Sequence, residues 1–189
     1  MKKYLVIGNP ISHSLSPKIH NYWLKQNNIN AVYDKIKLEE KEIERIILDI
    51  KKQKIAGCNV TVPFKKRVIP FLDKLSKQAE QTQSVNTIIF ERGNLIGHNT
   101  DIVGFDKAIK SLKFDMRGKK ILILGAGGVV PSIVLAIKEM DVLEITISNR
   151  TKKKAEDLKT RFNNLEILDW GKIIDFDVII NATSLGLHK

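Results

Sequence analysis

The sequence has little cysteine, proline or glycine. It contains one cysteine, Cys58, with five prolines and eleven glycines among 189 residues. A single cysteine excludes an intrachain disulfide, so we expect a reducing compartment, the cytoplasm. The few prolines and glycines leave no stretch with the composition of a disordered linker. The composition therefore indicates a folded, globular chain.

Long apolar runs are also missing. A membrane-spanning helix needs about 20 consecutive apolar residues, and no segment of this sequence approaches that length. Lys2 and Lys3 precede an apolar run over residues 4–7, which is too short for the apolar region of a signal peptide. We therefore expect no signal peptide and no membrane partner.

Positive charge predominates, with 32 Lys and Arg against 21 Asp and Glu and a net charge of +11. A basic surface can attract nucleic acid or anionic metabolites. The lysines are scattered, however, and neither an aromatic RNA-binding signature nor a long basic helix accompanies them. His13, His20, His98 and His188 show no metal-ligand spacing. We expect no metal and no nucleic-acid partner, and the basic charge leaves nucleic-acid binding open as a less favoured alternative.

The first half of the sequence alternates short apolar runs with amphipathic stretches. Ser16 and Pro17 are typical of a helix start, with Ser16 as the cap. Cys58 lies in an apolar run, and we expect it in the core. The expected elements are strands over residues 4–8, 31–38 and 55–62, helices from Ser16 and over 39–52, a helix over 64–83 interrupted at Pro70, and a hairpin with strands 87–90 and 94–98.

The second half continues the alternation. Strands that alternate with helices predict parallel sheets and an α/β fold. We expect a first domain over residues 1–100 with a mixed, mainly parallel sheet, and a Rossmann-like domain over residues 101–189. The expected elements of the second domain are strands over residues 120–124, 143–148, 165–168 and 177–180, and helices over 101–112, 129–140 and 151–162.

A glycine turn lies between a strand and a helix of the second domain. Gly125, Ala126, Gly127 and Gly128 directly follow the apolar strand. A pyrophosphate must approach backbone N–H groups at a helix start, and side chains at the glycines would block it. The third glycine of the usual G-x-G-x-x-G pattern is Val130 here, so the match is imperfect. The context of strand, turn and helix nevertheless predicts a dinucleotide site.

The next strand indicates which dinucleotide is bound. It ends in Asn149, Arg150 and Thr151, with Lys154 one helical turn further on. NAD-binding folds place an acidic residue near this point to hold the ribose 2′-hydroxyl. An arginine instead pairs with a 2′-phosphate, so the sequence favours NADP. A solvated basic helix start is the alternative, but cations there oppose the helix dipole.

Polar residues also gather where the strands of the first domain end. Asn59 and Thr61 are two apart on the third expected strand, so they face the same side. Polar groups at strand ends that face a second domain are typical of a binding cleft. The residues that we assign to this cleft are Ser14, Ser16, Asn59, Thr61, Lys65, Asn86 and Asp101.

Each of these residues also has a plainer interpretation. Lys65 stands beside Lys66 and Arg67, a group that composition alone assigns to a solvated surface cluster. Asp101 alone fits a favourable charge at a helix N-terminus. We interpret Trp23 and Trp170 as packing residues. Only agreement among several segments favours catalysis over these interpretations.

Taken together, the segments resemble the shikimate dehydrogenase family. The resemblance covers essentially the whole chain, in order and at compatible spacing. Seven concordant segments are far more specific than any one of them. They cover residues 8–10 with 12–17, 57–65, 84–87, 97–104, 125–128, 149–151 and 181–184.

The resemblance implies roles for the matched positions. Lys65 would be the central catalytic group, with Asp101 as its partner, during hydride transfer between NADP and the C3 position of shikimate or 3-dehydroshikimate. Ser14, Ser16, Asn59, Thr61 and Asn86 would also bind this small-molecule substrate. The residues implied for NADP are Gly125, Ala126, Gly127, Gly128, Asn149, Arg150, Thr151, Lys154, Asn181, Ala182, Thr183 and Ser184.

The sequence departs from the family in length. Family members are longer and end in helices that return to the substrate domain, so we expect a C-terminally truncated form and an incomplete nucleotide domain. Two alternatives remain open: a quinate/shikimate dehydrogenase that uses NAD, and a non-catalytic binding remnant. The expected assembly is a monomer or a homodimer.

Overall fold

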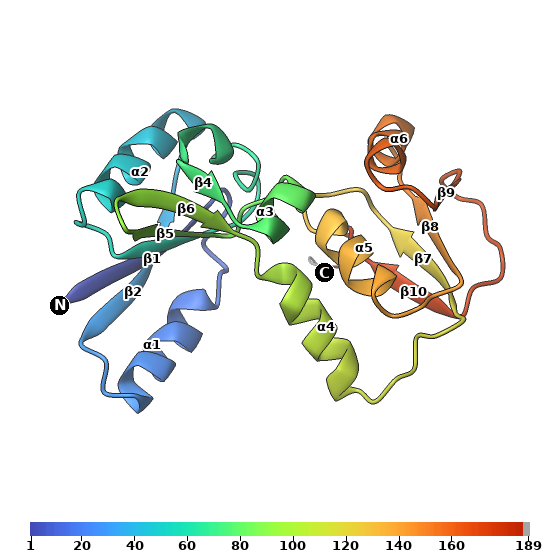
Figure 1. Cartoon of the computed structure of the whole chain (residues 1–189), viewed down its shortest axis with the longest axis horizontal. Coiled ribbons are helices and arrows are strands. Elements are labelled where there is room, and N and C mark those ends of the chain that lie inside the picture. Colours follow the sequence, from blue (N-terminus) through green and yellow to red (C-terminus); the bar gives the residue numbers. More distant parts are fainter. Residues whose placement is uncertain (187–189) are drawn as a thin grey trace. The chain divides into compact units, whose positions relative to one another are not determined.

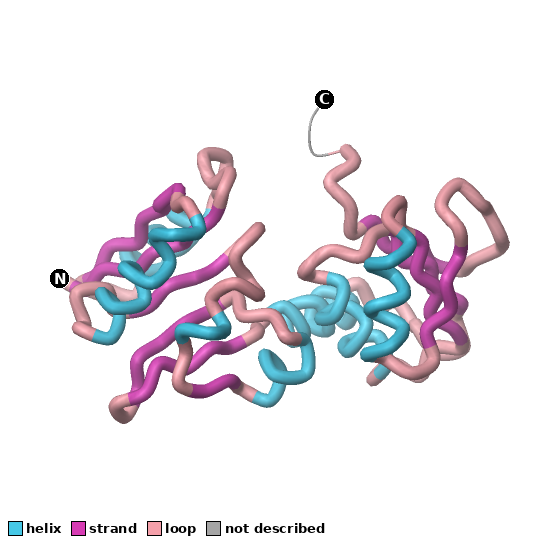
Figure 2. The backbone as a smooth tube through the Cα atoms, turned by 90° about the horizontal axis from the view of Figure 1, so that it is seen from above, coloured by secondary structure: helices cyan, strands magenta, loops and turns pink. Residues whose placement is uncertain are grey.

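The computed structural model describes residues 1–186 and divides the chain into two compact units, Met1–Thr100 and Asp101–Lys189 (Figure 1). In each unit the strands gather into a sheet bordered by helices (Figure 2). Within residues 1–186, every helix is too short or too polar to cross a bilayer.

The first unit is built on a six-stranded sheet in the order β2-β1-β3-β5-β6-β4. The pairs β1–β2, β1–β3 and β4–β6 are parallel, whereas β3–β5 and β5–β6 are antiparallel. The predicted mixed, mainly parallel sheet is therefore confirmed. Its strands are β1 (Lys2–Gly8), β2 (Ala31–Lys37), β3 (Gly57–Val60), β4 (Lys74–Leu75), β5 (Thr87–Glu91) and β6 (Asn94–His98).

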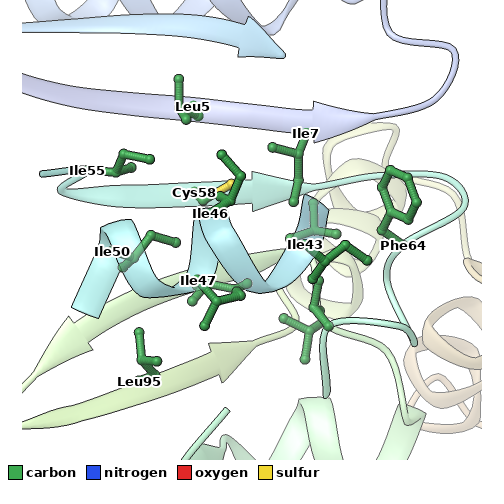
Figure 3. Close-up of a cluster of buried hydrophobic side chains, with 14 of the residues drawn as sticks. Leu5, Ile7, Ile43, Ile46, Ile47, Ile50, Ile55, Cys58, Phe64 and Leu95 are labelled. Atoms are coloured by element: carbon green, nitrogen blue, oxygen red, sulfur yellow. The ribbon is translucent and has the colours of Figure 1, made fainter. Parts of the chain in front are cut away.

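One face of this sheet packs against α2 (Ile43–Lys51), which follows the 3-10 turn η1 (Glu40–Glu42). The isoleucines of α2 recur at helical spacing, so they form a single apolar stripe that is entirely buried. Cys58 is only 3% exposed within the same cluster, so its predicted core position is confirmed. The labelled members of this core are Leu5, Ile7, Ile43, Ile46, Ile47, Ile50, Ile55, Cys58, Phe64 and Leu95 (Figure 3).

The opposite face is covered beside β1 and β2 by α1 (Ser16–Gln26). Asn21 joins α1 to β2 with two hydrogen bonds. Its Nδ2 donates to the Tyr33 carbonyl at 2.7 Å, and its Oδ1 accepts from the Tyr33 N–H at 2.9 Å. The predicted cap was wrong. Leu15 is the N-cap residue and already has helical angles, so Ser16 is the first helical residue and no side chain caps α1.

The helix predicted over residues 64–83 was also wrong. The segment holds only the 3-10 turn η2 (Ile69–Phe71), the short strand β4 and the helix α3 (Lys77–Thr82). Asp73 explains the change, because its N–H donates to the Leu95 carbonyl at 3.0 Å and its carboxylate accepts from the Leu95 N–H at 2.7 Å. These bonds draw the chain onto the edge of the sheet.

The second unit has a four-stranded, wholly parallel sheet in the order β10-β7-β8-β9. Counted from β7, this is the 3-2-1-4 order with which a Rossmann sheet begins. The helix α4 packs against α5, while α6 packs on β8 and β9. The Rossmann-like character is therefore confirmed. The elements are α4 (Asp101–Ser111), β7 (Lys120–Leu124), α5 (Val130–Lys138), β8 (Glu144–Ser148), α6 (Lys152–Arg161), β9 (Leu165–Leu168) and β10 (Val178–Asn181).

Candidate functional site

A pocket of about 270 Å³ lies at the carboxyl ends of the parallel strands of the second unit. All four strands contribute, because the lining comes from the loops that follow β7, β8, β9 and β10. Strand order reverses between β7 and β10, and such a switch point is where ligands bind in open α/β sheets. The lining residues are Gly125, Ala126, Gly127, Asn149, Arg150, Lys154, Trp170, Ala182, Thr183, Ser184 and Leu185.

The glycine turn after β7 shapes one wall of the pocket. Gly125 has φ of +110°, and a Cβ there would lie 2.9 Å from the Ala182 carbonyl oxygen, so only glycine fits. A Cβ at Gly127 would meet nothing within 4 Å, which leaves room for a phosphate to approach the backbone. Val130, at the third glycine position of the motif, is the first residue of α5 and is fully buried in the core. The imperfect motif therefore reflects packing and leaves the ligand side of the turn open.

Two cations, Arg150 and Lys154, line the pocket. Lys152 pairs with Asp169 at 2.9 Å, and Lys153 pairs with Asp157 at 3.4 Å. Within residues 1–186, Arg150 and Lys154 form no such ion pair, and both line the pocket.

The helix start beside them also favours an anion. The first turn of α6 contains no acidic residue, and no side chain caps the helix. A helix start without a side-chain cap, beside two cations that pair with no carboxylate of residues 1–186, suits a phosphate group. The residues present therefore fit the ribose 2′-phosphate of NADP.

The loop after β10 is shaped by its own polar residues. Asn181 Oδ1 accepts from the Thr183 N–H at 3.0 Å and from its hydroxyl at 2.7 Å, while Asn181 Nδ2 donates to the Leu185 carbonyl at 3.2 Å. These bonds fold residues 182–185 into the pocket wall. Asn181 itself does not line the pocket, and neither do Gly128 and Thr151, the other predicted cofactor residues that stand outside the lining.

Trp170 was missed as a pocket residue. It is 44% exposed and lines the pocket, so its interpretation as a packing residue was wrong. The sequence did contain a signal, because Trp170 follows a predicted strand closely, as the other lining residues do. Trp23 is 54% exposed on α1 and contacts the His20 ring edge-to-face, with the centroids 5.4 Å apart, so it packs only in part.

Predicted substrate residues of the first unit form a hydrogen-bonded group. Asn59 Nδ2 donates to the Asn86 carbonyl at 3.2 Å and to Thr87 Oγ1 at 3.0 Å. Asn86 Oδ1 in turn accepts from the Thr100 N–H at 3.1 Å. These bonds join the end of β3, the start of β5 and the residue that precedes Asp101.

The backbone adds Thr61 and Lys65 to this group. The Thr61 N–H donates to the Ile7 carbonyl at 2.9 Å, which holds Thr61 beside the end of β1. The Lys65 carbonyl accepts from the Val85 N–H at 2.8 Å, which places the lysine loop beside Asn86. Asn59, Thr61, Lys65 and Asn86 therefore gather at the carboxyl ends of β1 and β3.

The remaining predicted substrate residues are Ser14 and Ser16 of the first unit and Asp101 of the second. Ser14 lies in the loop between β1 and α1 and Ser16 is the first residue of α1, and Ser14 Oγ accepts from the Ser16 N–H at 3.3 Å. Asp101 is the first residue of α4 and belongs to the second unit. All three are half-buried. The half-buried polar side chains of the first unit suit recognition of a small polyhydroxylated ligand.

Burial controls the protonation of two groups beside Asn59. Loss of solvent raises the pKa of Tyr33, and the neighbouring Cys58 raises it further, so the phenol stays protonated. Burial raises the pKa of the Cys58 thiol to about 12, which makes a thiolate nucleophile inaccessible at neutral pH. Within residues 1–186, no three His, Cys, Asp or Glu side chains gather as metal ligands, and His188 lies outside the described residues.

Both units match known proteins. Residues 6–88 match the family described as "Shikimate dehydrogenase substrate binding domain", and residues 106–187 match "Shikimate / quinate 5-dehydrogenase". A shikimate dehydrogenase (NADP(+)) of Pelagibacter ubique is 56% identical over 188 residues, which cover 100% of this chain and 71% of the relative.

Solved structures agree with these matches. The shikimate dehydrogenase of Aquifex aeolicus superimposes with a TM-score of 0.89 at 38% identity, covering 99% of this chain and 70% of that one. The Thermus thermophilus enzyme in complex with NADP(H) and shikimate gives 0.90 at 30% identity, with 99% and 70% coverage. Family matches in both units and high identity along the whole sequence lead to one conclusion: the chain belongs to the shikimate dehydrogenase family.

Proposed function

We propose that this protein is an NADP-dependent shikimate dehydrogenase, which reversibly reduces 3-dehydroshikimate to shikimate in the synthesis of chorismate and the aromatic amino acids. One observation carries the proposal: the pocket of the second unit combines an open glycine turn with two cations that pair with no carboxylate of residues 1–186, and the pocket lining contains no acidic residue. Relatives named as NADP(+) enzymes support the same cofactor. The single cysteine supports a cytoplasmic setting.

The second unit, residues 101–189, would bind NADP. Gly127 leaves space for the pyrophosphate against the start of α5, while Arg150 and Lys154 pair with the 2′-phosphate. Asn149 also lines this part of the pocket, and its Nδ2 donates to the Thr151 carbonyl at 2.8 Å, which fixes the turn that presents Arg150. A carboxylate at this point would repel the phosphate, so the residues support NADP over NAD.

The first unit, residues 1–100, would bind the substrate. Ser14, Ser16, Asn59, Thr61 and Asn86 offer hydroxyl and amide groups to the ring hydroxyls and the carboxylate. The hydrogen bonds among Asn59, Asn86 and Thr87 support this role, because they fix the amide groups before a ligand arrives.

Lys65 and Asp101 would carry the proton chemistry. When bound, the reduced nicotinamide supplies a hydride to the C3 carbonyl carbon. The Lys65 ammonium group stabilises the negative charge that develops on the oxygen and donates the proton that completes the alcohol. Asp101 would be the partner of Lys65 and would balance the charge of the lysine, as the family resemblance implies. In the reverse direction, neutral Lys65 takes the hydroxyl proton.

A direct assay tests the proposal. Purified protein is mixed with NADP⁺ and shikimate, and the formation of NADPH is followed by its absorbance, with the Thermus thermophilus enzyme as positive control. We expect turnover with shikimate, and much less with quinate or with NAD⁺. Calorimetry with each ligand is run in parallel. Tight binding without turnover would support a non-catalytic binding protein, and absence of both would contradict the proposal.

A further inference from the structure

Trp170 occupies an unusual position for a large aromatic side chain. It is 44% exposed and does not belong to the buried core cluster of its unit. Within residues 1–186 its ring has no aromatic or cationic partner. It is the one aromatic residue among those that line the pocket. An indole that is partly exposed at a pocket wall can offer a ring face to a planar ligand.

The backbone holds this indole in a defined turn. The Lys172 N–H donates to the Asp169 carbonyl at 3.1 Å, which closes a four-residue turn over 169–172. Gly171, at the third position, has φ of +86°, the value typical of a type II turn, which glycine adopts readily. Trp170 occupies the second position, so the hydrogen bond restrains its backbone although the loop is exposed.

An ion pair joins this turn to the phosphate side of the pocket. Asp169, directly before Trp170, accepts from Lys152 Nζ at 2.9 Å. Lys152 opens α6, the helix that also carries Lys154. The indole and the two pocket cations are therefore held on connected segments that contribute to the same pocket.

The pocket thus contains a third chemical element beside the glycine turn and the cations. A dinucleotide presents three groups here: a pyrophosphate, a ribose phosphate and a planar base. The first two match the glycine turn and the pair Arg150 and Lys154. We propose that Trp170 forms the base-binding wall of this pocket, against which the adenine ring stacks. The inference rests on the proposed use of NADP and adds a residue that determines its affinity.

Fluorescence of Trp170 gives a direct test. The chain has two tryptophans, so a Trp23→Phe background leaves Trp170 as the only indole. Adenosine 2′,5′-bisphosphate, which has the base and both phosphates, should quench its emission strongly. Inorganic pyrophosphate, which has no base, should leave it nearly unchanged. Equal responses to the two probes would overturn the proposal.

Affinity measurements supply the second arm. Stacking of a base on an aromatic side chain contributes to the free energy of binding. We therefore expect Trp170→Ala to weaken the affinity for adenosine 2′,5′-bisphosphate about tenfold, as measured by calorimetry. Trp170→Phe should recover much of the loss. Ile173→Ala is the matched control, because Ile173 belongs to the same loop, is 93% exposed and does not line the pocket. Thermal unfolding of each variant checks that the fold is retained.

The outcomes separate this inference from the proposed function. If the unmodified protein binds the bisphosphate and Trp170→Ala binds it equally well, the stacking proposal is wrong and the NADP site stands. If the unmodified protein binds neither the bisphosphate nor NADP⁺, the proposed dinucleotide site is wrong, and the proposed role of Trp170 is wrong as well. Loss of affinity in Trp170→Ala with recovery in Trp170→Phe supports both.

Discussion

The Tyr33 hydroxyl donates a 2.6 Å hydrogen bond to Oδ1 of Asn59 and so joins β2 to β3 over the intervening strand β1. The direction of this bond is determined by its surroundings. Asn59 Nδ2 faces the Asn86 carbonyl, which can only accept, so Oδ1 must face the phenol and the phenol must donate. Tyr33 therefore fixes the orientation of an amide in the proposed substrate site.

Tyr33→Phe removes this bond and leaves the ring in place. We expect a loss of about 1 kcal/mol in the free energy of unfolding, the usual net contribution of one hydrogen bond. A loosened Asn59 should raise the KM for shikimate, with the KM for NADP little changed. Tyr22→Phe is the control, since Tyr22 is 61% exposed on α1. An unchanged shikimate KM would show that Tyr33 does not position Asn59.

Lys65→Ala should lower kcat by orders of magnitude and leave the fold intact, because the developing alkoxide would lose both its positive partner and its proton donor. Lys66→Ala removes the same charge from an exposed neighbour of the half-buried Lys65 and should retain activity. Steady-state kinetics and thermal unfolding of both variants test this. Similar kcat values for Lys65→Ala and the unmodified protein would show that the role is misassigned.

Arg150→Ala should weaken NADP use and leave NAD use little changed, since only NADP carries the 2′-phosphate that we assign to this guanidinium. We expect the KM for NADP to rise by about tenfold or more, in the range of charge-assisted hydrogen bonds. Lys153→Ala removes a nearby cation that already pairs with Asp157 and should have little effect. A parallel loss with both cofactors would indicate a general structural defect.

Gly125 and Gly127 of the turn should respond differently to alanine. Gly125→Ala places a Cβ 2.9 Å from the Ala182 carbonyl at φ of +110°, so we expect destabilisation of about 1–3 kcal/mol. Gly127→Ala meets no protein atom within 4 Å and should keep its stability while NADP binding weakens. Urea unfolding and calorimetry separate the two effects. Equal stability of the variants would contradict the assigned roles.

The Lys152–Asp169 pair makes a prediction about acid pH. A hydrogen bond from Lys152, supported by its charge, lowers the pKa of Asp169. A lowered pKa favours the carboxylate in the folded state, so the pair persists from neutral pH down to the ordinary aspartate range, about 3.9, and is lost only as the pH falls through the lowered value. NMR titration of the carboxyl carbon should show this. In Lys152→Ala the midpoint should rise towards the ordinary value, and an unchanged midpoint would disprove the coupling.

Much of the fold could be predicted where local signals agree. The limits of β7 and β9 follow from apolar runs bounded by polar residues, and both match the predicted strands. The β5–β6 hairpin follows from Arg92 and Gly93, which both adopt the positive φ that a tight hairpin turn requires. The glycine turn and Arg150 could be predicted because each directly follows an expected strand, so their positions can be read from the order of residues in the sequence.

Other features depend on contacts between distant residues. The strand β4 has two residues and exists because Asp73 is bonded to Leu95, which no local pattern predicts. The pairing of Asn21 with Tyr33 also requires the fold before it can be seen. Trp170 was wrongly interpreted as a packing residue because hydrophobicity alone suggests burial. Its side chain is instead partly exposed, next to the turn at Gly171.

The amide of Asn59 has a consequence for what it can recognise. Both of its protons are already directed at protein oxygens, those of Asn86 and Thr87, and only a lone pair on Oδ1 remains. A ligand atom that meets this amide must therefore bring a proton of its own. Alcohols satisfy that condition, whereas a keto oxygen or a carboxylate would face an electron pair. Asn59 would thus favour a hydroxyl group of the ring over a keto or carboxylate group.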